Sequence, residues 1–239
     1  MADHDSNASA SFDEYAAFYD HALARGLAVT GEDRNYYARG RIEWLRKCLD
    51  RIKVHGGFVI EFGCGTGANV PYLFTRAGAA SVVGIDASMT SLEIAGKRFG
   101  SETVRFLSSR EYIPNSEADL VFCNGVFHHI PPAHRAEAVG YLYRCLRPGG
   151  LFALWENNPW NPGTRYVMSR IAFDKGAITL SAPQARRLVQ AAGFEMLRTD
   201  FLFIFPRFLR WLRPVEPHLS HLPIGGQYEI LCRKPYAPS

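Results

Sequence analysis

The chain has 239 residues, 47% of them apolar and 21% charged, which is ordinary globular usage and allows a full core to be buried. The net charge of +4 lies wholly in residues 181–239, which carry 8 basic and 4 acidic side chains. This excess is too small to indicate a protein that binds nucleic acid through a concentrated basic face. The five cysteines form no CxxC pair and no Cys/His ligand spacing, so they indicate reduced thiols rather than disulfides or a zinc site.

The first residues are acidic and polar, without the apolar region of a signal peptide. No segment approaches the ~20 apolar residues that span a bilayer. We therefore predict a cytoplasmic protein. Residues 1–11, rich in Ser, Asn, Ala and Asp, predict a disordered tail. Apolar residues then recur three and four positions apart over residues 12–49, which predicts a helical cap that the segment HGG at 55–57 ends.

From residue 55 onward, short apolar runs alternate with helical patterns. Expected strands cover residues 58–62, 81–86, 103–107, 118–123 and 151–156. Expected helices cover residues 68–77, 88–99 and 133–146, and a tight turn is expected at 148–150. Single helices between strands predict a doubly wound, mostly parallel sheet that binds ligands at the carboxyl ends of its strands.

The last part of the chain continues this pattern. Ser181 and Gln184 form a capping-box pair and Gly193 follows the last turn, so a helix is expected between them. Two further strands are expected at 194–205 and 227–234, which makes seven. No internal repeat or long linker divides the chain. We therefore predict one α/β domain over 12–239, made of a helical cap (12–54), a cofactor-binding core (55–156) and an acceptor-side insertion and lid (157–226).

The segment VIEFGCGTGANV, residues 59–70, places three glycines at every second position directly after an expected strand. This spacing fits a loop that holds a nucleotide against its backbone, and with Ala68 it also fits the dinucleotide fingerprint GxGxxG/A. No GK[ST] follows, so the loop is not a phosphate-binding P-loop. The glycines alone leave two kinds of nucleotide cofactor open.

Glu61 distinguishes between these cofactors. It stands two positions before the first glycine, at the end of a strand, where we expect it to face the pocket. A pyrophosphate favours bare N–H groups over a carboxylate, whereas S-adenosylmethionine carries a sulfonium and an ammonium and no phosphate. Two like charges ~4 Å apart cost about 4 kcal/mol at an effective dielectric near 20, and opposite charges gain as much. Glu61 therefore favours S-adenosylmethionine over NAD.

Asp86 ends the next expected strand, where its carboxylate can accept hydrogen bonds from both hydroxyls of a ribose. S-adenosylmethionine and NAD both present those hydroxyls, so Asp86 indicates an adenosine ligand without distinguishing the two. The alternative interpretation is a glycine turn followed by an ordinary helix-capping aspartate.

Four segments in order, VIEFGCGTG, VVGIDAS, ADLVFCNGVFHHI and LRPGGLF, resemble the class I S-adenosylmethionine-dependent methyltransferases over about residues 55–156. The chain is most similar to the small-molecule branch of that family that includes quinone-biosynthesis enzymes. The resemblance implies a Rossmann-like methyltransferase fold with seven strands and S-adenosylmethionine as the cofactor. We expect methyl transfer to a small, rather apolar acceptor.

By position, the resemblance also implies which residues bind the cofactor. Where the family often has an aspartate near the adenine, this chain has a serine at 109, which can still form a hydrogen bond. Tyr19 on the cap helix is a further candidate contact, with packing as the alternative. The implied residues are Glu61, Gly63, Cys64, Gly65, Gly67 and Asn124 around the methionyl part, Asp86 at the ribose, and Ala87, Ser88, Ser109 and Arg110 near the adenine.

His128 and His129 follow the fourth expected strand, at the mouth of the pocket. Methyl transfer mainly requires that the acceptor and the methyl group are held in a near-attack geometry. A base is needed only where the acceptor nucleophile is protonated near neutral pH. These two histidines are the catalytic candidates, with a structural hydrogen bond as the alternative for each.

Asn158-Pro159-Trp160 is similar to the [DN]PP[YF] motif of DNA amino-methylating enzymes. It lacks the second proline, and it follows the fifth strand, whereas that motif belongs after the fourth. We therefore expect no DNA substrate and predict that this loop shapes the acceptor pocket, or forms a plain rigid turn.

The segment Phe205–Arg213 has apolar residues on one face of an expected helix and three arginines off that face. A basic amphipathic segment of this kind fits peripheral contact with an anionic membrane surface. The alternatives are a lid over the acceptor and packing on the sheet.

Other functions stay open at this point. The basic last quarter of the chain allows a macromolecular acceptor such as RNA, which a steep salt dependence would reveal. The adenosine site also allows a nucleotide-binding module without catalysis, or an NAD enzyme. The methylated atom and the oligomeric state do not follow from the sequence.

Overall fold

The computed structural model describes residues 25–171, 174 and 176–236. The predicted tail, the first part of the predicted cap and the candidate contact Tyr19 lie outside these residues. The described part of the cap includes a short 3-10 helix, η1 (Ala28–Thr30), and a long helix, α3 (Arg34–Arg51), whose N-cap Asp33 accepts a hydrogen bond from the backbone N–H of Tyr36.

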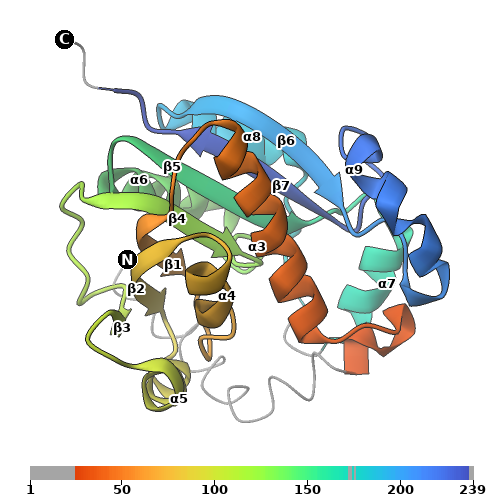
Figure 1. Cartoon of the computed structure of the whole chain (residues 1–239), viewed down its shortest axis with the longest axis horizontal. Helices are drawn as coiled ribbons and strands as arrows, with labels where there is room; N and C mark the ends of the chain where they lie inside the picture. Colours follow the sequence, from red (N-terminus) through yellow and green to blue (C-terminus); the bar gives the residue numbers. More distant parts are fainter. Residues whose placement is uncertain (1–24, 172–173, 175, 237–239) are drawn as a thin grey trace.

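Within the described residues, seven strands form one sheet in the order β3-β2-β1-β4-β5-β7-β6 (Figure 1). The first five strands pair in parallel, and β7 runs antiparallel to both of its neighbours. The predicted doubly wound, mostly parallel sheet is confirmed. The strands are β1 (Gly57–Phe62), β2 (Ala79–Asp86), β3 (Val104–Ser108), β4 (Ala118–Asn124), β5 (Leu146–Asn157), β6 (Glu195–Leu202) and β7 (Gln227–Arg233).

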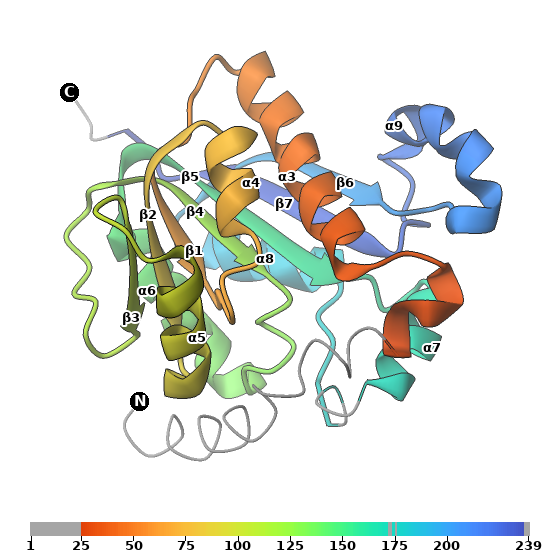
Figure 2. The same cartoon turned by 60° about the horizontal axis from the view of Figure 1, so that its bottom comes forward.

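Helices cover both faces of the sheet (Figures 1 and 2). Ile42 and Leu45 of α3 and Leu73 of α4 pack with one set of alternating strand residues, and Val139 of α6 and Val189 of α8 pack with the other set. The remaining helices are α4 (Val70–Thr75), α5 (Met89–Phe99), η2 (Pro132–His134), α6 (Arg135–Cys145), α7 (Pro162–Arg170), α8 (Ala182–Ala191), η4 (Arg207–Val215) and α9 (Glu216–Leu219).

Local capping explains where several helices begin. Ser88 accepts a hydrogen bond from the backbone N–H of Ser91 at the start of α5, and the predicted capping box of Ser181 and Gln184 opens α8. The helix after the glycine loop is shorter than the predicted range of 68–77, because the loop continues to Asn69, the N-cap of α4.

Three segments differ from the sequence predictions. The predicted turn at 148–150 lies inside β5 as a bulge, because Gly149 and Gly150 exchange backbone hydrogen bonds with Lys234 beyond β7. The strand predicted to reach residue 205 ends at Leu202, since Phe203 has a positive φ of 61°. The predicted amphipathic helix forms as the 3-10 helix η4, which contains Pro214 and leaves Phe208 76% exposed.

No helix among the described residues is long and apolar enough to cross a membrane.

Candidate functional site

The strand order reverses between β1 and β4, and a doubly wound sheet binds its ligands in the crevice at such a point. Three of the predicted side chains lie at the carboxyl ends of the strands around it. Glu61 lies on β1, Asp86 ends the neighbouring β2, and Asn124 ends β4 on the other side of β1. The topology thus places these three side chains at one edge of the sheet.

The glycine loop after β1 is held in an open conformation that only glycines adopt easily. Gly63, Gly65 and Gly67 have φ values of 73°, 50° and 78°. A Cβ atom at Gly63 would lie 2.1 Å from Cγ2 of Val126, whereas a Cβ at Gly65 would meet nothing within 4 Å. Gly63 is therefore required by packing, and Gly65 leaves room for a ligand against the backbone.

Glu61 is 1% exposed, and only one of its two carboxylate oxygens has a hydrogen-bond partner. The side-chain amide of Asn69 donates to Oε1 at 2.7 Å, while the buried Oε2 has no partner. Burial raises the pKa of Glu61 to about 7, against the opposing effects of Asn69 and of Arg34. A cation beside Oε2 would stabilise the ionised form.

Asp86 connects the glycine loop to the start of α5. Its Oδ2 accepts from the backbone N–H of Gly65 at 2.7 Å, and its Oδ1 accepts from the backbone N–H of Ser88 at 3.0 Å. Each carboxylate oxygen has a second lone pair, so the same side chain can accept from both hydroxyls of a ribose while it fixes the loop.

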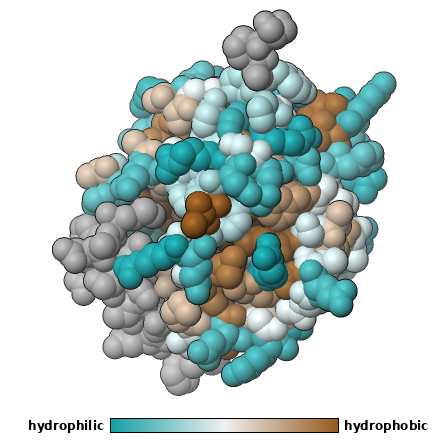
Figure 3. All heavy atoms as spheres, turned by 90° about the vertical axis from the view of Figure 1, so that its left-hand side faces the viewer, coloured by the Kyte–Doolittle hydropathy of each residue, from teal (hydrophilic) through white to brown (hydrophobic). Residues whose placement is uncertain are grey.

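Exposed apolar side chains follow the ends of β2 and β3, which are neighbours in the sheet. Met89 begins α5 and is 49% exposed, and Ile113 in the segment after β3 is 79% exposed. Ser109 and Arg110 lie in that same segment after β3. The face on the β3 side, seen in Figure 3, carries apolar atoms among polar ones. Such a surface suits the flat, apolar faces of an adenine.

Several other residues singled out from the sequence pack in the core or cap helices. The thiol of Cys64 is buried against Gly84, so only the backbone of Cys64 is available to a cofactor. The hydroxyl of Ser88 caps α5, and its side chain is 1% exposed, while the neighbouring Ala87 is half-buried. His134 ends η2 directly before α6, and its side chain is 42% exposed.

Arg34 was missed by the sequence analysis. It is the first residue of α3, and both of its terminal nitrogens lie close to the hydroxyl of Thr66 in the glycine loop, at 3.4 and 3.3 Å. Its positive charge acts on Glu61 and lowers the pKa of that carboxyl. Only the packing of α3 on the sheet brings this cationic side chain to the glycine loop.

His128 is buried and paired with a glutamate that the sequence analysis also missed. Nδ1 of His128 lies 2.6 Å from Oε2 of Glu156 on β5, and Oε1 of Glu156 accepts from the backbone N–H of Phe127 at 2.7 Å. Burial alone would lower the pKa of His128, but the carboxylates of Glu156 and Asp174 outweigh it and raise that pKa. His128 and Glu156 thus form a buried ion pair in which Glu156 orients the ring.

His129 lies beside His128, with the ring centroids 4.1 Å apart. Burial and the charge of His128 lower the pKa of His129 to about 4, so its ring is neutral near pH 7. Its Nε2 lies 3.5 Å from Oδ1 of Asp174. The two adjacent histidines therefore occupy one site but differ in charge.

A pocket of about 430 Å³ opens beside these histidines and Asn124. Its lining includes the polar side chains of Arg34, Arg41, Asn157, Asn161 and Gln227. It also includes apolar side chains in and after α7 and before and in η4, which are Val167, Met168, Ile171, Phe203, Phe205 and Phe208. The pocket can therefore hold a small molecule with a polar and an apolar part.

The Asn/Pro/Trp loop has a mainly structural role. Asn158 is fully buried, and its amide donates to the backbone carbonyls of Pro223 and Gly225 at 3.0 and 2.8 Å. Asn161 caps α7 by accepting from the backbone N–H of Thr164 at 2.9 Å. Asn157 and Asn161 line the pocket, whereas Asn158 holds the loop in place.

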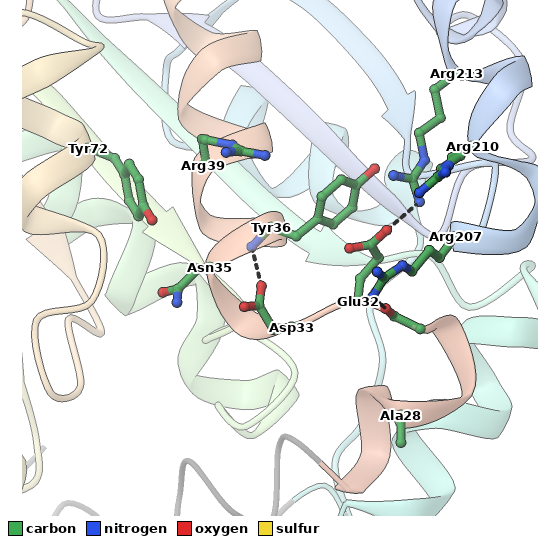
Figure 4. A pocket seen from close by; sticks show the side chains of 11 residues that line it. Ala28, Glu32, Asp33, Asn35, Tyr36, Arg39, Tyr72, Arg207, Arg210 and Arg213 are labelled. Carbon is green, nitrogen blue, oxygen red and sulfur yellow. Dashed lines mark hydrogen bonds and ion pairs between the residues drawn. The ribbon is translucent and has the colours of Figure 1, made fainter.

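A second, wider pocket of about 730 Å³ lies between α3 and η4. Arg207, Arg210 and Arg213 extend from η4 toward the cap (Figure 4). Arg213 pairs with Glu32 at 2.9 Å and stacks over the ring of Tyr36, 4.5 Å from its centroid. These contacts hold η4 to the cap.

Comparison with known proteins identifies the same segments. Residues 59–150 match a family model described as a methyltransferase domain. Two trans-aconitate 2-methyltransferases are similar. The enzyme of Azoarcus sp. is 31% identical over 128 residues, which cover 52% of this chain and 50% of that protein. The enzyme of Methylobacterium nodulans is 29% identical over 194 residues, which cover 73% of this chain and 74% of that protein. The chain thus aligns with half the length of the first and about three quarters of the second.

Among solved structures, a methyltransferase dependent on S-adenosylmethionine from Thermotoga maritima superposes with a TM-score of 0.64. It is 21% identical, and the superposition covers 95% of this chain and 99% of that one. At this identity the likeness shows the fold, which is the Rossmann-like methyltransferase fold expected from the sequence.

Alanine substitutions at two glycines should separate packing from ligand binding. Gly65→Ala should cost no more than about 1–2 kcal/mol of unfolding free energy, the cost of a left-handed conformation, and should weaken cofactor binding. Gly63→Ala should cost more stability than Gly65→Ala, because its Cβ meets Val126 as well. Urea unfolding and titration calorimetry measure the two effects. Equal stability losses in both variants, or unchanged cofactor affinity in Gly65→Ala, would contradict this assignment.

Proposed function

We propose that this chain, which belongs to the class I S-adenosylmethionine-dependent methyltransferases, methylates a small molecule held in the pocket beside Asn124 and the two histidines. When bound, the cofactor supplies an electrophilic methyl group on a sulfonium, whose S–C bond breaks as the acceptor attacks in line. The residues of the chain hold the acceptor in that line and exclude water from the pocket.

The observation that carries the proposal is a pair of opposite charges at the glycine loop. The buried carboxylate of Glu61 has an oxygen without a hydrogen-bond partner, and the guanidinium of Arg34 lies at Thr66 of the same loop. The methionyl head group has an ammonium and a carboxylate, which complement these two charges. A pyrophosphate has only negative charge, and Glu61 would repel it. Asn124, whose buried Oδ1 also has no partner, offers the head group a further acceptor.

The adenosine half of the cofactor fits the neighbouring strand ends. Asp86 accepts from the ribose hydroxyls, and the exposed side chains of Met89 and Ile113 cover the faces of the adenine. Ser109 and Arg110, in the segment after β3, lie near its polar edge. The small side chain of Ala87 and the backbone of Ser88 complete this part of the site.

The pocket supports an acceptor that is less apolar than the sequence suggested. Arg34 and Arg41 make part of the lining cationic, while the aromatic residues before and in η4 make another part apolar. Two relatives are named for trans-aconitate, a polycarboxylate, and two arginines would suit an acceptor with such a group. A small molecule with an anionic head and an apolar body fits both parts of the lining. A pocket of about 430 Å³ does not favour an RNA acceptor.

We assign His128 and His129 to contact with the acceptor, since both line its pocket together with Asn124. Glu156 is the positioning residue, because its carboxylate fixes the ring of His128 at 2.6 Å and does not line the pocket.

We also propose that η4 contacts an anionic membrane surface when the acceptor enters the pocket from that membrane. Phe208 and Trp211 are 76% and 71% exposed, and Arg207 and Arg210 are exposed on the same nine-residue helix. Aromatic side chains enter the headgroup region, and each arginine adds about 1 kcal/mol near anionic lipid.

Glu61→Gln should reduce the affinity for S-adenosylmethionine about tenfold or more at pH 7.5, because it removes the charge that pairs with the ammonium. Wild-type affinity should rise several-fold from pH 6 to 7.5, since the cofactor binds the ionised carboxylate and the pKa of Glu61 is about 7. The variant should lose this rise. Titration calorimetry at several pH values measures both effects.

The matched control is Glu137→Gln, an exposed glutamate on α6, which should behave as wild type. Asp86→Ala should weaken the binding of S-adenosylmethionine and of NAD alike, whereas Glu61→Gln should weaken only the former. Unchanged S-adenosylmethionine affinity in Glu61→Gln would contradict the proposal that the charge of Glu61 pairs with the ammonium of the cofactor.

Replacing Phe208 and Trp211 together by serine should weaken binding to phosphatidylglycerol vesicles by at least about tenfold, because two exposed aromatic side chains are lost. Co-sedimentation measures the bound fraction, with phosphatidylcholine vesicles as the neutral control. Equal binding of the variant and the wild type to anionic vesicles, or no binding by either, would contradict membrane contact through η4.

A further inference from the structure

Three side chains that could bind a metal meet at the inner end of the acceptor pocket. His128 and His129 follow β4, and Asp174 lies in the segment after α7. One nitrogen of each histidine and one carboxylate oxygen of Asp174 lie within 4.8 Å of one another. All three residues line the pocket. Two imidazoles and a carboxylate form a donor set that divalent transition-metal ions commonly bind.

The distances in this cluster suit a shared cation better than direct hydrogen bonds. Nε2 of His128 and Nε2 of His129 lie 3.6 and 3.5 Å from Oδ1 of Asp174. Two ligands at ordinary Zn²⁺ bond lengths in a tetrahedral arrangement are ~3.4 Å apart. A hydrogen bond between nitrogen and oxygen would be about 2.9 Å long. The two nitrogen–oxygen distances therefore have the spacing of ligands around one ion.

Asp174 provides an independent observation. Its side chain is 4% exposed, and its buried Oδ1 has no hydrogen-bond partner. A buried carboxylate oxygen normally accepts a hydrogen bond. This oxygen lies 3.6 and 3.5 Å from the two imidazoles, so a cation among the three groups would satisfy it and would take the place of the proton on Nε2 of His128.

Glu156 supports His128 in the way that carboxylates support metal-binding histidines. Its Oε2 lies 2.6 Å from Nδ1 of His128, and its Oε1 is fixed by the backbone N–H of Phe127. A carboxylate that accepts from Nδ1–H leaves the lone pair of Nε2 for a metal and sets the direction of the ring. Nε2 is the nitrogen that faces Asp174.

Backbone hydrogen bonds keep Asp174 opposite the histidines. The N–H of Asp174 donates to the carbonyl of Ile171 at the end of α7, and the N–H of Ala177 donates to the carbonyl of Asp174. The N–H of Ile178 donates to the carbonyl of His128 at 2.9 Å, which ties this segment to the histidine loop. Backbone hydrogen bonds thus connect the segment that carries Asp174 to the loop that carries both histidines.

We propose that His128, His129 and Asp174 bind a divalent transition-metal cation such as Zn²⁺, with its remaining coordination positions open to the acceptor pocket. Three protein ligands and an open position are typical of metal sites that bind a substrate oxygen. The cation would hold an oxygen of the acceptor and favour its ionised form. This role in acceptor binding rests on the proposed function, whereas the binding of the cation does not.

A second cluster, Cys48, Asp200 and Glu229, has similar spacing but a different environment. Asp200 already accepts hydrogen bonds from the side chains of Trp44, Arg198 and Ser220. This cluster is a buried hydrogen-bond network between α3 and the sheet, and it needs no cation to satisfy Asp200.

The test is a Co²⁺ titration of the untagged full chain after dialysis against a chelator. Visible d–d absorption reports Co²⁺ in a site of low symmetry, and subsequent addition of Zn²⁺ should abolish it. The wild type should bind one Co²⁺. Asp174→Asn and His129→Gln should each bind at least tenfold more weakly, and Glu156→Gln about 10–100-fold more weakly. His134→Gln, at an exposed histidine on η2, should match the wild type.

The affinity of each variant for S-adenosylmethionine is measured in parallel and shows that the variant is folded. Absence of the visible band in the wild type, or equal Co²⁺ affinity in the wild type and in Asp174→Asn, would overturn the metal site. Co²⁺ binding in a protein that does not bind S-adenosylmethionine would support the site and contradict the proposed function instead. The two failures are therefore distinguishable.

Discussion

A carboxylate buried at the end of a strand needs hydrogen bonds or a positive charge to be stable as an anion, and much of this site is arranged around that constraint at Glu61. Asn69 satisfies one carboxylate oxygen, and Arg34 provides a nearby positive charge. The second oxygen is buried without a hydrogen-bond partner. A ligand with an ammonium group fits this environment, and a ligand with a pyrophosphate does not. The choice of cofactor thus follows from the burial of one side chain.

The sheet brings the parts of the site together because parallel strands end at the same edge. The glycine loop, Asp86 and Asn124 come from β1, β2 and β4, which are adjacent in the sheet. The acceptor pocket is built differently, from α7, η4, the start of α3 and the strand ends beyond β4. The proposed cofactor site is therefore built on the sheet, and the proposed acceptor site is built on the segments that cover it.

The sequence predicted what is encoded locally. The glycine spacing, the acid before it, the Asp at the end of β2 and the capping box of α8 all lie within short segments, and each forms as expected. Arg34, Glu156 and Asp174 could not be found in the same way, because each reaches the site from an element distant in the sequence. The 3-10 form of η4 was not predicted, for another reason. Its apolar spacing fits an α-helix, but Pro214 and the non-helical Leu209 prevent one.

The most direct test of the account is to incubate the protein with methyl-labelled S-adenosylmethionine and an extract of the cells that produce it. The label is then partitioned between the small-molecule fractions, organic and aqueous, and the precipitated macromolecules. We expect protein-dependent label in a small-molecule product, and this label should be lost with Glu61→Gln. Label in the macromolecular pellet, or no transfer by a protein that binds the cofactor, would contradict this expectation.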